Sequence, residues 1–250
     1  MKPHFVKVAL LVVSLLFVWS LAGNALTDKL RSFQPATQPE PVEIAWQTRA
    51  SGFDLRHIPL GDGRISSQPE NGSVWACASR RRPGRAAHAI GDWIHADGTY
   101  DLTSKPTVPG SIRWQSQLRI QKNGSQRSLT GNRLPQDPTG RFPISPRDYA
   151  YNYDHNPNSI QSANYRIDVA ANPQVTEASC LRMGTIGVLL NGTHLFNALD
   201  VARKDAVAYE IQDRCQGHPE RSGIYHYHSI PTCLDDRDSG KGHSALVGYA

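Results

Sequence analysis

The sequence lacks several features that identify common enzyme and metal-binding classes. Its 250 residues include only four cysteines, and no two of them stand in a CxxC spacing. A cysteine-ligated metal site is therefore the less favoured interpretation. No G-x-S-x-G segment occurs, which removes the usual nucleophile motif of serine hydrolases. Internal repeats of fixed period and low-complexity tracts are also lacking, so a repeat architecture is not expected.

An excess of charge of one sign is lacking as well. Without residues 1–25 the chain would lose Lys2 and Lys7 and no acid, leaving 25 Lys and Arg against 22 Asp and Glu. Such a balance is too weak to indicate a nucleic-acid partner. The basic run at 80–85 contains Pro and Gly, so a solvated loop is favoured over an anion-binding surface. Long helices are not expected either, because 20 Gly and 17 Pro favour turns.

Long apolar runs are limited to Val8–Ala22, near the N-terminus. Lysines precede this run and small residues follow it, as in a secretory signal with cleavage after Ala25. We therefore predict a signal peptide at 1–25, a linker at 26–41 and export to the periplasm or the cell exterior. An uncleaved N-terminal membrane anchor is the alternative, although the run is short for a span of about 20 residues.

The remainder, residues 42–250, is predicted to be one mainly-β domain. Short apolar stretches alternate with turn residues, which favours a β-sandwich-like fold with long irregular loops. One short helix is expected within 195–210, where apolar residues recur at helical spacing. The expected strands cover 42–46, 53–58, 73–78, 92–100, 111–120, 165–170 and 180–190.

Residues 131–165 are rich in Pro, Asn and Asp and show no periodicity. Long irregular segments of this kind are often functional. Their oxygen-bearing side chains suit calcium, but no EF-hand spacing is present, and ordinary turn chemistry is favoured over a calcium site. The residues concerned are Asp137, Asp148, Asn152, Asp154, Asn156 and Asn158.

Four of the ten histidines lie in one stretch, residues 213–243. His226 and His228 would point to the same face of an extended strand, with Tyr225 and Tyr227 on the other. Two imidazoles in this arrangement suit zinc or copper, with His218 or His243 as a third ligand. Asp213 is expected to bind the metal or to orient a histidine. Binding should weaken as the pH falls through the histidine range near about 6.5.

The four cysteines predict two disulfides if the protein is exported. Three pairings are compatible with four cysteines. Cys215 and Cys233 flank the Tyr-His-Tyr-His strand closely enough to bridge it, so this pair is favoured. Cys77–Cys180 follows by elimination.

The segment from Asp213 through CQGH, GIYHYH and PTC resembles the bacterial YHYH protein family. Further blocks at 93–114, 134–145, 153–160 and 187–200 are similar to that family, so the resemblance covers the chain from about Trp46 onward. It implies an exported protein whose histidines at 218, 226, 228 and 243 match the family pattern. It implies no particular reaction, and whether the protein is an enzyme is left open. The family pattern continues beyond residues 244–250, which implies a domain that is incomplete at its C-terminus.

Two alternatives to metal binding remain. One is a metal-independent secreted hydrolase that uses a histidine with Asp213, Asp235 or Asp236 as acid and base. The other is a surface module that binds a glycan or peptide through Trp75, Trp93 and Trp114. The expected partner is a small-molecule or surface ligand, and membrane contact is expected only through an uncleaved N-terminus.

Overall fold

The computed structural model describes residues 54–77, 89–231, 233–234 and 246–250. The chain divides into two units, Met1–Thr37 and Gln38–Ala250, and all described residues belong to the second. The predicted signal peptide, the linker, the strand at 42–46 and the basic run lie outside the described residues. They remain predictions.

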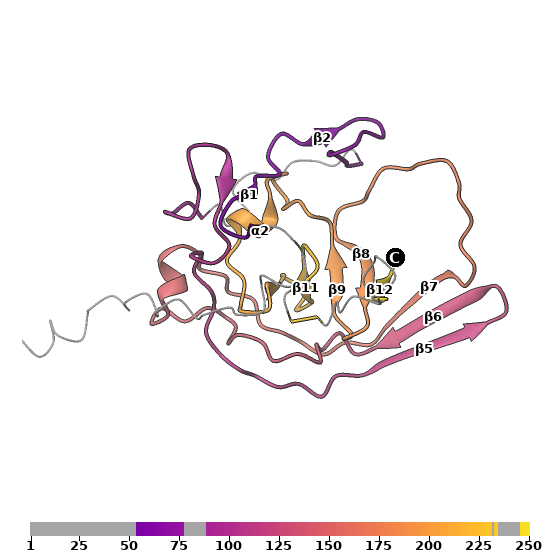
Figure 1. Ribbon diagram of the computed structural model, residues 1–250. Coiled ribbons are helices and arrows are strands. Elements are labelled where there is room, and N and C mark those ends of the chain that lie inside the picture. Colours follow the sequence, from indigo (N-terminus) through magenta and orange to yellow (C-terminus); the bar gives the residue numbers. More distant parts are fainter. Residues whose placement is uncertain (1–53, 78–88, 232, 235–245) are drawn as a thin grey trace, which may run out of the picture. The chain divides into compact units, whose positions relative to one another are not determined.

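Most described elements are strands, which confirms the mainly-β class. The largest sheet has five strands in the order β10-β11-β9-β8-β12. β11 pairs parallel with β9, and the other three pairs are antiparallel. Figure 1 shows β11, β9, β8 and β12 side by side. The strands of this sheet are β8 (Thr185–Leu189), β9 (His194–Phe196), β10 (Gly217–Pro219), β11 (Tyr225–Tyr227) and β12 (Gly248–Tyr249).

A three-stranded antiparallel sheet has the order β5-β6-β7. It consists of β5 (Leu118–Asn123), β6 (Gln126–Gly131) and β7 (Tyr165–Ala170). Side chains of β7 alternate between half-buried and exposed, as its alternating sequence requires. Gly124 in the β5–β6 turn has a φ of +60°, a conformation that glycine adopts at little cost.

The remaining strands form two small pairs, β1 with β4 and β2 with β3. Each strand is only two residues long. β1, β3 and β4 are much shorter than predicted, because side-chain oxygens bind nearby backbone groups instead, and β2 was not predicted. Asp97, for example, accepts the N–H of Thr99 in the turn before β4. The four strands are β1 (Ile58–Pro59), β2 (Ile65–Ser66), β3 (Val74–Trp75) and β4 (Thr99–Tyr100).

The helix predicted within 195–210 exists but is shorter than the apolar periodicity suggests. The α-helix α2 covers only Ala206–Tyr209. Asp200 accepts backbone N–H groups in a turn before it, and Arg203 has a φ of +67°, outside the helical range. Asp205 then caps α2 by accepting a backbone N–H. No described helix has the length and apolar character that crossing a bilayer requires.

The predicted irregular segment contains a single 3-10 turn, η1 (Tyr149–Asn152), among its described residues. Its asparagines support the β10–β11 hairpin. The side-chain amides of Asn156 and Asn158 both donate to the carbonyl oxygen of Pro219, at 3.1 Å and 3.3 Å. The backbone N–H of Gln161 donates to the carbonyl of Gly223 in the hairpin turn. The loop therefore holds one end of the hairpin in place.

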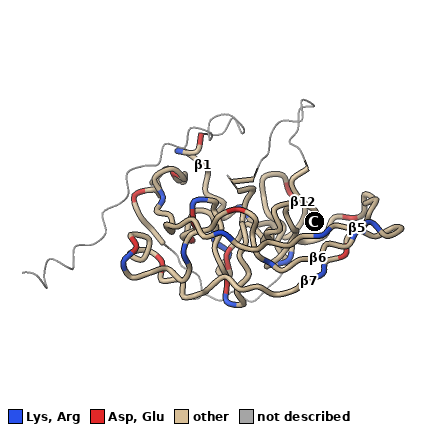
Figure 2. Tube along the Cα trace, turned by 90° about the horizontal axis from the view of Figure 1, so that it is seen from below, with Lys and Arg blue, Asp and Glu red and all other residues tan. Residues whose placement is uncertain are grey.

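Two apolar clusters form the core. One surrounds Trp93, whose indole Nε1–H donates to the carbonyl of Ala208 in α2. The other contains Tyr225 and Tyr227, which have no exposed surface, together with Leu134, Ile160 and Leu189. The tyrosine side of β11 is therefore the core side. Charged residues of both signs are interspersed along the described trace in Figure 2.

Both predicted cysteine pairs form disulfides. Cys77 is bonded to Cys180 and Cys215 to Cys233, with S–S distances of 2.01 Å and 1.99 Å. The first joins the segment after β3 to the segment before β8. The second joins the segment before β10 to the segment after β11.

The packing of Gly217 generates a stability prediction. A Cβ atom at this position would collide with the ring and hydroxyl of Tyr225, which lie directly against the backbone of β10. Gly217→Ala should therefore lower the free energy of unfolding by about 1–3 kcal/mol, because a buried ring must move. Chemical denaturation followed by circular dichroism measures this loss.

Gly184→Ala is the matched control. Nothing lies within 4 Å of a Cβ at Gly184, so only its positive φ of +85° opposes the substitution. That conformation should cost about 1 kcal/mol. A loss for Gly217→Ala no larger than for the control would contradict the packing argument.

Candidate metal centre

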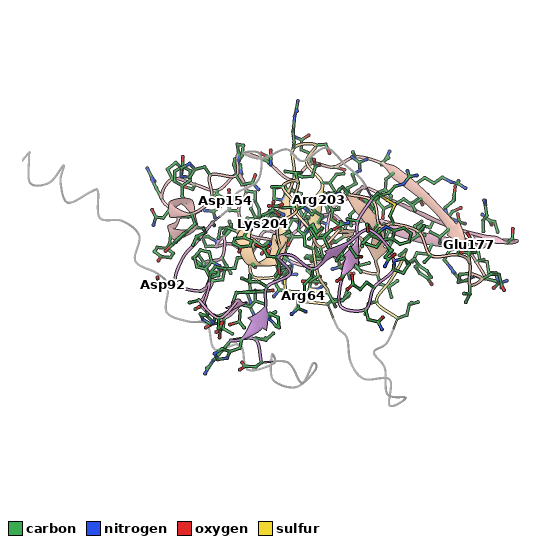
Figure 3. The ribbon with its side chains drawn as sticks, turned by 90° about the horizontal axis from the view of Figure 1, so that it is seen from above. Arg64, Asp92, Asp154, Glu177, Arg203 and Lys204 are labelled. Carbon is green, nitrogen blue, oxygen red and sulfur yellow. A yellow bond between two sulfur atoms is a disulfide. The ribbon has the colours of Figure 1, made fainter. Side chains whose placement is uncertain are left out.

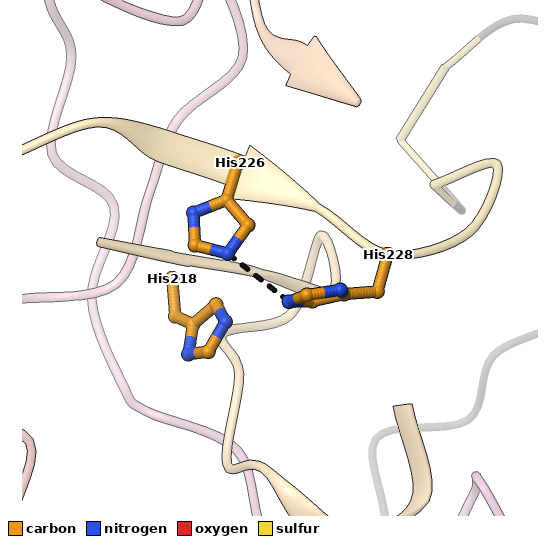
Figure 4. Close-up of side chains that lie close together, drawn as sticks. All are labelled: His218, His226 and His228. Carbon is orange, nitrogen blue, oxygen red and sulfur yellow. Dashed lines mark hydrogen bonds between the residues drawn. The ribbon is translucent and has the colours of Figure 1, made fainter. Parts of the chain in front are cut away.

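The β10–β11 hairpin brings three histidines together. His218 is the register partner of His226, and His228 lies on the same face as His226, as the two-residue period of an extended chain requires. The ring centroid of His218 lies 4.6 Å from that of His226 and 5.5 Å from that of His228. Figure 4 shows the three rings converging. One ring nitrogen from each lies within 4.8 Å of the others, so the group could hold a metal ion.

Backbone carbonyls determine which nitrogens face the centre. Nδ1 of His226 lies 3.0 Å from the carbonyl oxygen of Ile224, and Nδ1 of His228 lies 2.6 Å from that of Asn197. Because a carbonyl oxygen only accepts, we assign the proton of each neutral ring to Nδ1. Each Nε2 then presents a lone pair. The two Nε2 atoms are 3.0 Å apart, so this contact is favourable only with a cation, a proton or a metal ion, between them.

Glu210 supplies a fourth group, which the sequence analysis missed. Its Oε2 atom lies 3.3 Å from Nε2 of His218 and 3.2 Å from Nε2 of His228. A tetrahedron with metal–ligand bonds of about 2.0–2.1 Å has edges of about 3.3–3.4 Å. Three of the six possible separations, 3.0–3.3 Å, are close to those edges, and the three histidine nitrogens lie within 4.8 Å of one another. The carboxylate of Glu210 thus lies beside two of the three converging histidines.

The cluster is buried. His226 is 2% exposed, and the ring of Phe196 stacks on it with centroids 3.8 Å apart. Burial, together with His218 and His228, holds the pKa of His226 well below its ordinary value, which favours the neutral ring. Burial alone would raise the pKa of Glu210, but the adjacent His218 and His228 outweigh it and hold this pKa well below the ordinary range. A neutral imidazole and an ionised carboxylate are the forms that bind metals.

Further buried charges surround Glu210. Burial raises the pKa of Asp154, against the attraction of His218. Burial lowers the pKa of Lys105 to about 7, and its Nζ donates to Oε1 of Gln212 at 2.6 Å. The oxygens considered for calcium are used locally: Asp148 accepts the N–H of Ser145, and Asn156 accepts that of Asn158.

Asp213 lies on the opposite side of the hairpin from the histidines. Its carboxylate accepts the backbone N–H groups of Gly140, Cys215 and Gly217 and the hydroxyl of Tyr225, at 2.8–3.2 Å. Burial raises the pKa of Asp213 to about 6, although these donors oppose the shift. The structure therefore gives this residue a place in the tyrosine-side core.

His194 occupies the next position in the same row of side chains, as the register partner of His226 in β9. Its Nδ1 lies 3.0 Å from Oγ1 of Thr185, and its ring packs edge-on against Tyr165. Burial, aided by Arg133, lowers the pKa of His194 to about 4. It does not belong to the group of nitrogens that converge.

The other predicted site residues are distributed as follows. His243, Asp235 and Asp236 lie outside the described residues. Trp93 is a core residue with 2% exposure, whereas Trp75 and Trp114 are half-buried and line separate clefts. A single acid within an otherwise apolar segment, AVAYEI, was the signal for Glu210 in the sequence.

The Tyr225–Asp213 hydrogen bond generates a pH-dependent prediction. Above about pH 6 the carboxylate is ionised in the folded protein, and the phenol then donates a charge-assisted bond. Tyr225→Phe should cost about 1.5–3 kcal/mol of folding free energy near pH 7.5, and less near pH 5, where Asp213 is protonated. Urea unfolding at both pH values measures the difference.

Tyr151→Phe serves as the control, because this half-buried tyrosine stacks on His155 through its ring face. Its loss should be small and the same at both pH values. A Tyr225→Phe penalty that does not change with pH would rule out the charge-assisted bond.

Comparison with known proteins identifies a family for the C-terminal part of the chain. A family model described as YHYH protein matches residues 165–250. No curated protein and no solved structure is detectably similar to the chain. The blocks at 93–114, 134–145 and 153–160 lie outside the match, so their resemblance remains a prediction. The matched residues, 165–250, contain Glu210 and the three converging histidines, so the candidate metal centre lies within the part of the chain that is similar to the YHYH protein family.

Proposed function

We propose that this protein binds a transition metal ion, zinc or copper, through His218, His226, His228 and Glu210. The observation that carries the proposal is the 3.0 Å approach of two Nε2 atoms, both of which present lone pairs. Glu210 adds an anionic oxygen to the same point. The lone pairs of these atoms repel one another, and a divalent cation between them would bind all of them. It would also satisfy Oε2 of Glu210 and Nε2 of His218, which lack hydrogen-bond partners.

Zinc is the favoured ion. Three imidazoles and one carboxylate provide borderline and hard ligands, and three of the ligand separations are close to the edges of a tetrahedron, the geometry that zinc prefers. Copper(II) favours tetragonal arrangements, so it is the second choice. Three buried histidines and a half-buried carboxylate resemble a closed structural site more than an open catalytic site. We therefore favour a metal-stabilised domain over a metalloenzyme.

Export is part of the same proposal. Two disulfides among the described residues fit an oxidising compartment, such as the periplasm or the cell exterior. Metal binding in that setting would stabilise a domain whose largest sheet is built from strands of two to five residues. The apolar N-terminal run supports the same location.

Removing the two β11-side ligands tests the site directly. Purified wild-type protein should contain or take up about one zinc ion per chain, and His226→Ala/His228→Ala should abolish this uptake. Elemental analysis and calorimetric titration with zinc and with copper measure the stoichiometry and affinity. His57→Ala/His95→Ala is the matched control, because these two rings are also neighbours, 5.5 Å apart, but lie outside the cluster. Wild-type protein with no affinity for either ion would refute the proposal.

Glu210→Gln tests the fourth ligand separately. The amide keeps the shape of the side chain but lacks the charge, so zinc affinity should fall by about tenfold to a hundredfold while the three-histidine set remains. In cobalt-substituted protein the visible absorption of a four-coordinate ion should change. Glu177→Gln is the control, because Glu177 is exposed and lies well away from Asp154 and Lys204 in Figure 3. Equal affinities of the two variants would remove Glu210 from the coordination shell.

A further inference from the structure

One disulfide encloses the candidate metal centre. Cys215 and Cys233 close a loop of sequence separation 18, and His218, His226 and His228 all lie within it. The Cys77–Cys180 disulfide spans 103 positions and encloses none of the four proposed ligands. Only the Cys215–Cys233 disulfide therefore restrains the segment that carries the three histidines.

The enclosed loop is restrained chiefly along the hairpin itself. β10 and β11 pair with each other, β11 also pairs with β9, and Asn156 and Asn158 bind Pro219 at the turn end. These contacts hold β10, β11 and the turn, whereas the segment between His228 and Cys233 lies beyond the strands. Cys215 is buried, and its backbone N–H donates to the carboxylate of Asp213. Its Sγ lies next to the carbonyl oxygen of Pro138. Cys233 follows His228 by five positions and is half-buried. The disulfide thus ties the segment after His228 to a fixed point next to β10.

Holding ligands in their bound arrangement strengthens binding, because less conformational entropy is lost when the ion enters. With the disulfide open, β11 keeps its pairing to β9, but the segment after His228 loses its covalent attachment. His228 is the ligand most affected, since it lies one residue beyond β11. The bond from its Nδ1 to the carbonyl of Asn197 would then hold the ring without the covalent restraint beyond it, so the 3.0 Å approach of its Nε2 to that of His226 would be less tightly fixed.

We propose that the Cys215–Cys233 disulfide controls metal retention at the histidine centre, an inference that rests on the proposed metal site. The reductant is a dithiol. Its thiolate attacks Sγ of the more accessible Cys233, the S–S bond breaks, and Cys215 leaves as a thiolate that takes up a proton. The second thiol of the reductant then displaces Cys233 as a thiol, and the reductant leaves as its own disulfide. Reduction opens the loop and weakens metal binding. Thiol–disulfide exchange with a disulfide oxidant, which is itself reduced to its dithiol, closes the loop again and restores binding.

Thermodynamic reciprocity gives the proposal a second consequence. If the closed disulfide strengthens metal binding, bound metal must stabilise the disulfide against reduction by the same factor. The effect should be confined to Cys215–Cys233. Cys77–Cys180 serves as an internal reference in the same molecule.

The first experiment measures zinc affinity of the full chain by competition with a chromophoric chelator. Cys215→Ser/Cys233→Ser should bind zinc about tenfold to a hundredfold more weakly than wild type. Cys77→Ser/Cys180→Ser should match wild type. Unchanged affinity in the first variant, or an equal loss in both, overturns the inference.

The second experiment uses wild-type protein only, so it does not depend on the folding of a variant. The protein is equilibrated in a series of glutathione redox buffers with and without zinc, at a fixed free zinc concentration. Thiol alkylation and peptide mass spectrometry give the reduced fraction of each disulfide at equilibrium. Zinc should shift the midpoint of Cys215–Cys233 to more reducing conditions and leave that of Cys77–Cys180 unchanged, whereas equal midpoints with and without zinc overturn the inference. Failure of wild-type protein to bind zinc at all would instead refute the metal site itself.

Discussion

Two imidazole nitrogens held face to face are the constraint on which the rest of the site depends. Neither ring is free to turn its proton inward, because the carbonyls of Ile224 and Asn197 occupy both Nδ1 atoms. These carbonyls come from different parts of the chain, one from the residue before β11 and the other from the residue after β9. The parallel pairing of β9 and β11 is what brings them to the same place. Backbone carbonyls, more than side chains, therefore determine that the ring nitrogens facing the centre present lone pairs.

The remaining ligands arrive through the connection between those two strands. A parallel pair requires a crossover, and here the crossover from β9 to β11 carries α2, Glu210 and β10. Glu210 follows α2 directly, and His218 sits at the middle of β10. The other face of the hairpin is anchored by Asp213, which collects donors from three backbone positions and from Tyr225. Core and candidate site thus share the same two short strands.

Some of this organisation could be predicted from local sequence. The alternation of Tyr and His in a strand assigns each type to one face, and the cysteines that flank it indicate a disulfide. The mainly-β class follows from short apolar stretches between turn residues. Glu210 could not be predicted, because its approach to His218 and His228 depends on the crossover and not on spacing. Asp213 was expected near the metal from proximity in sequence, but Gly140 and Tyr225 hold its carboxylate on the core side. The helix was overestimated because Asp200 accepts backbone N–H groups in the turn before it and Arg203 has a positive φ.

The two-residue period of β11 also limits how the chain can change in length. An insertion or deletion of one residue between Tyr225 and His228 would exchange the two faces, placing imidazoles in the apolar core and phenols beside Glu210. The turn at 220–224 is constrained at Gly223, which is buried and accepts the N–H of Gln161, but its Arg221 and Ser222 are exposed. Length variation in the hairpin is therefore easier to accommodate at Arg221–Ser222 than in the strand. In Tyr225–His228 the alternation of the residues therefore matters as much as their identity.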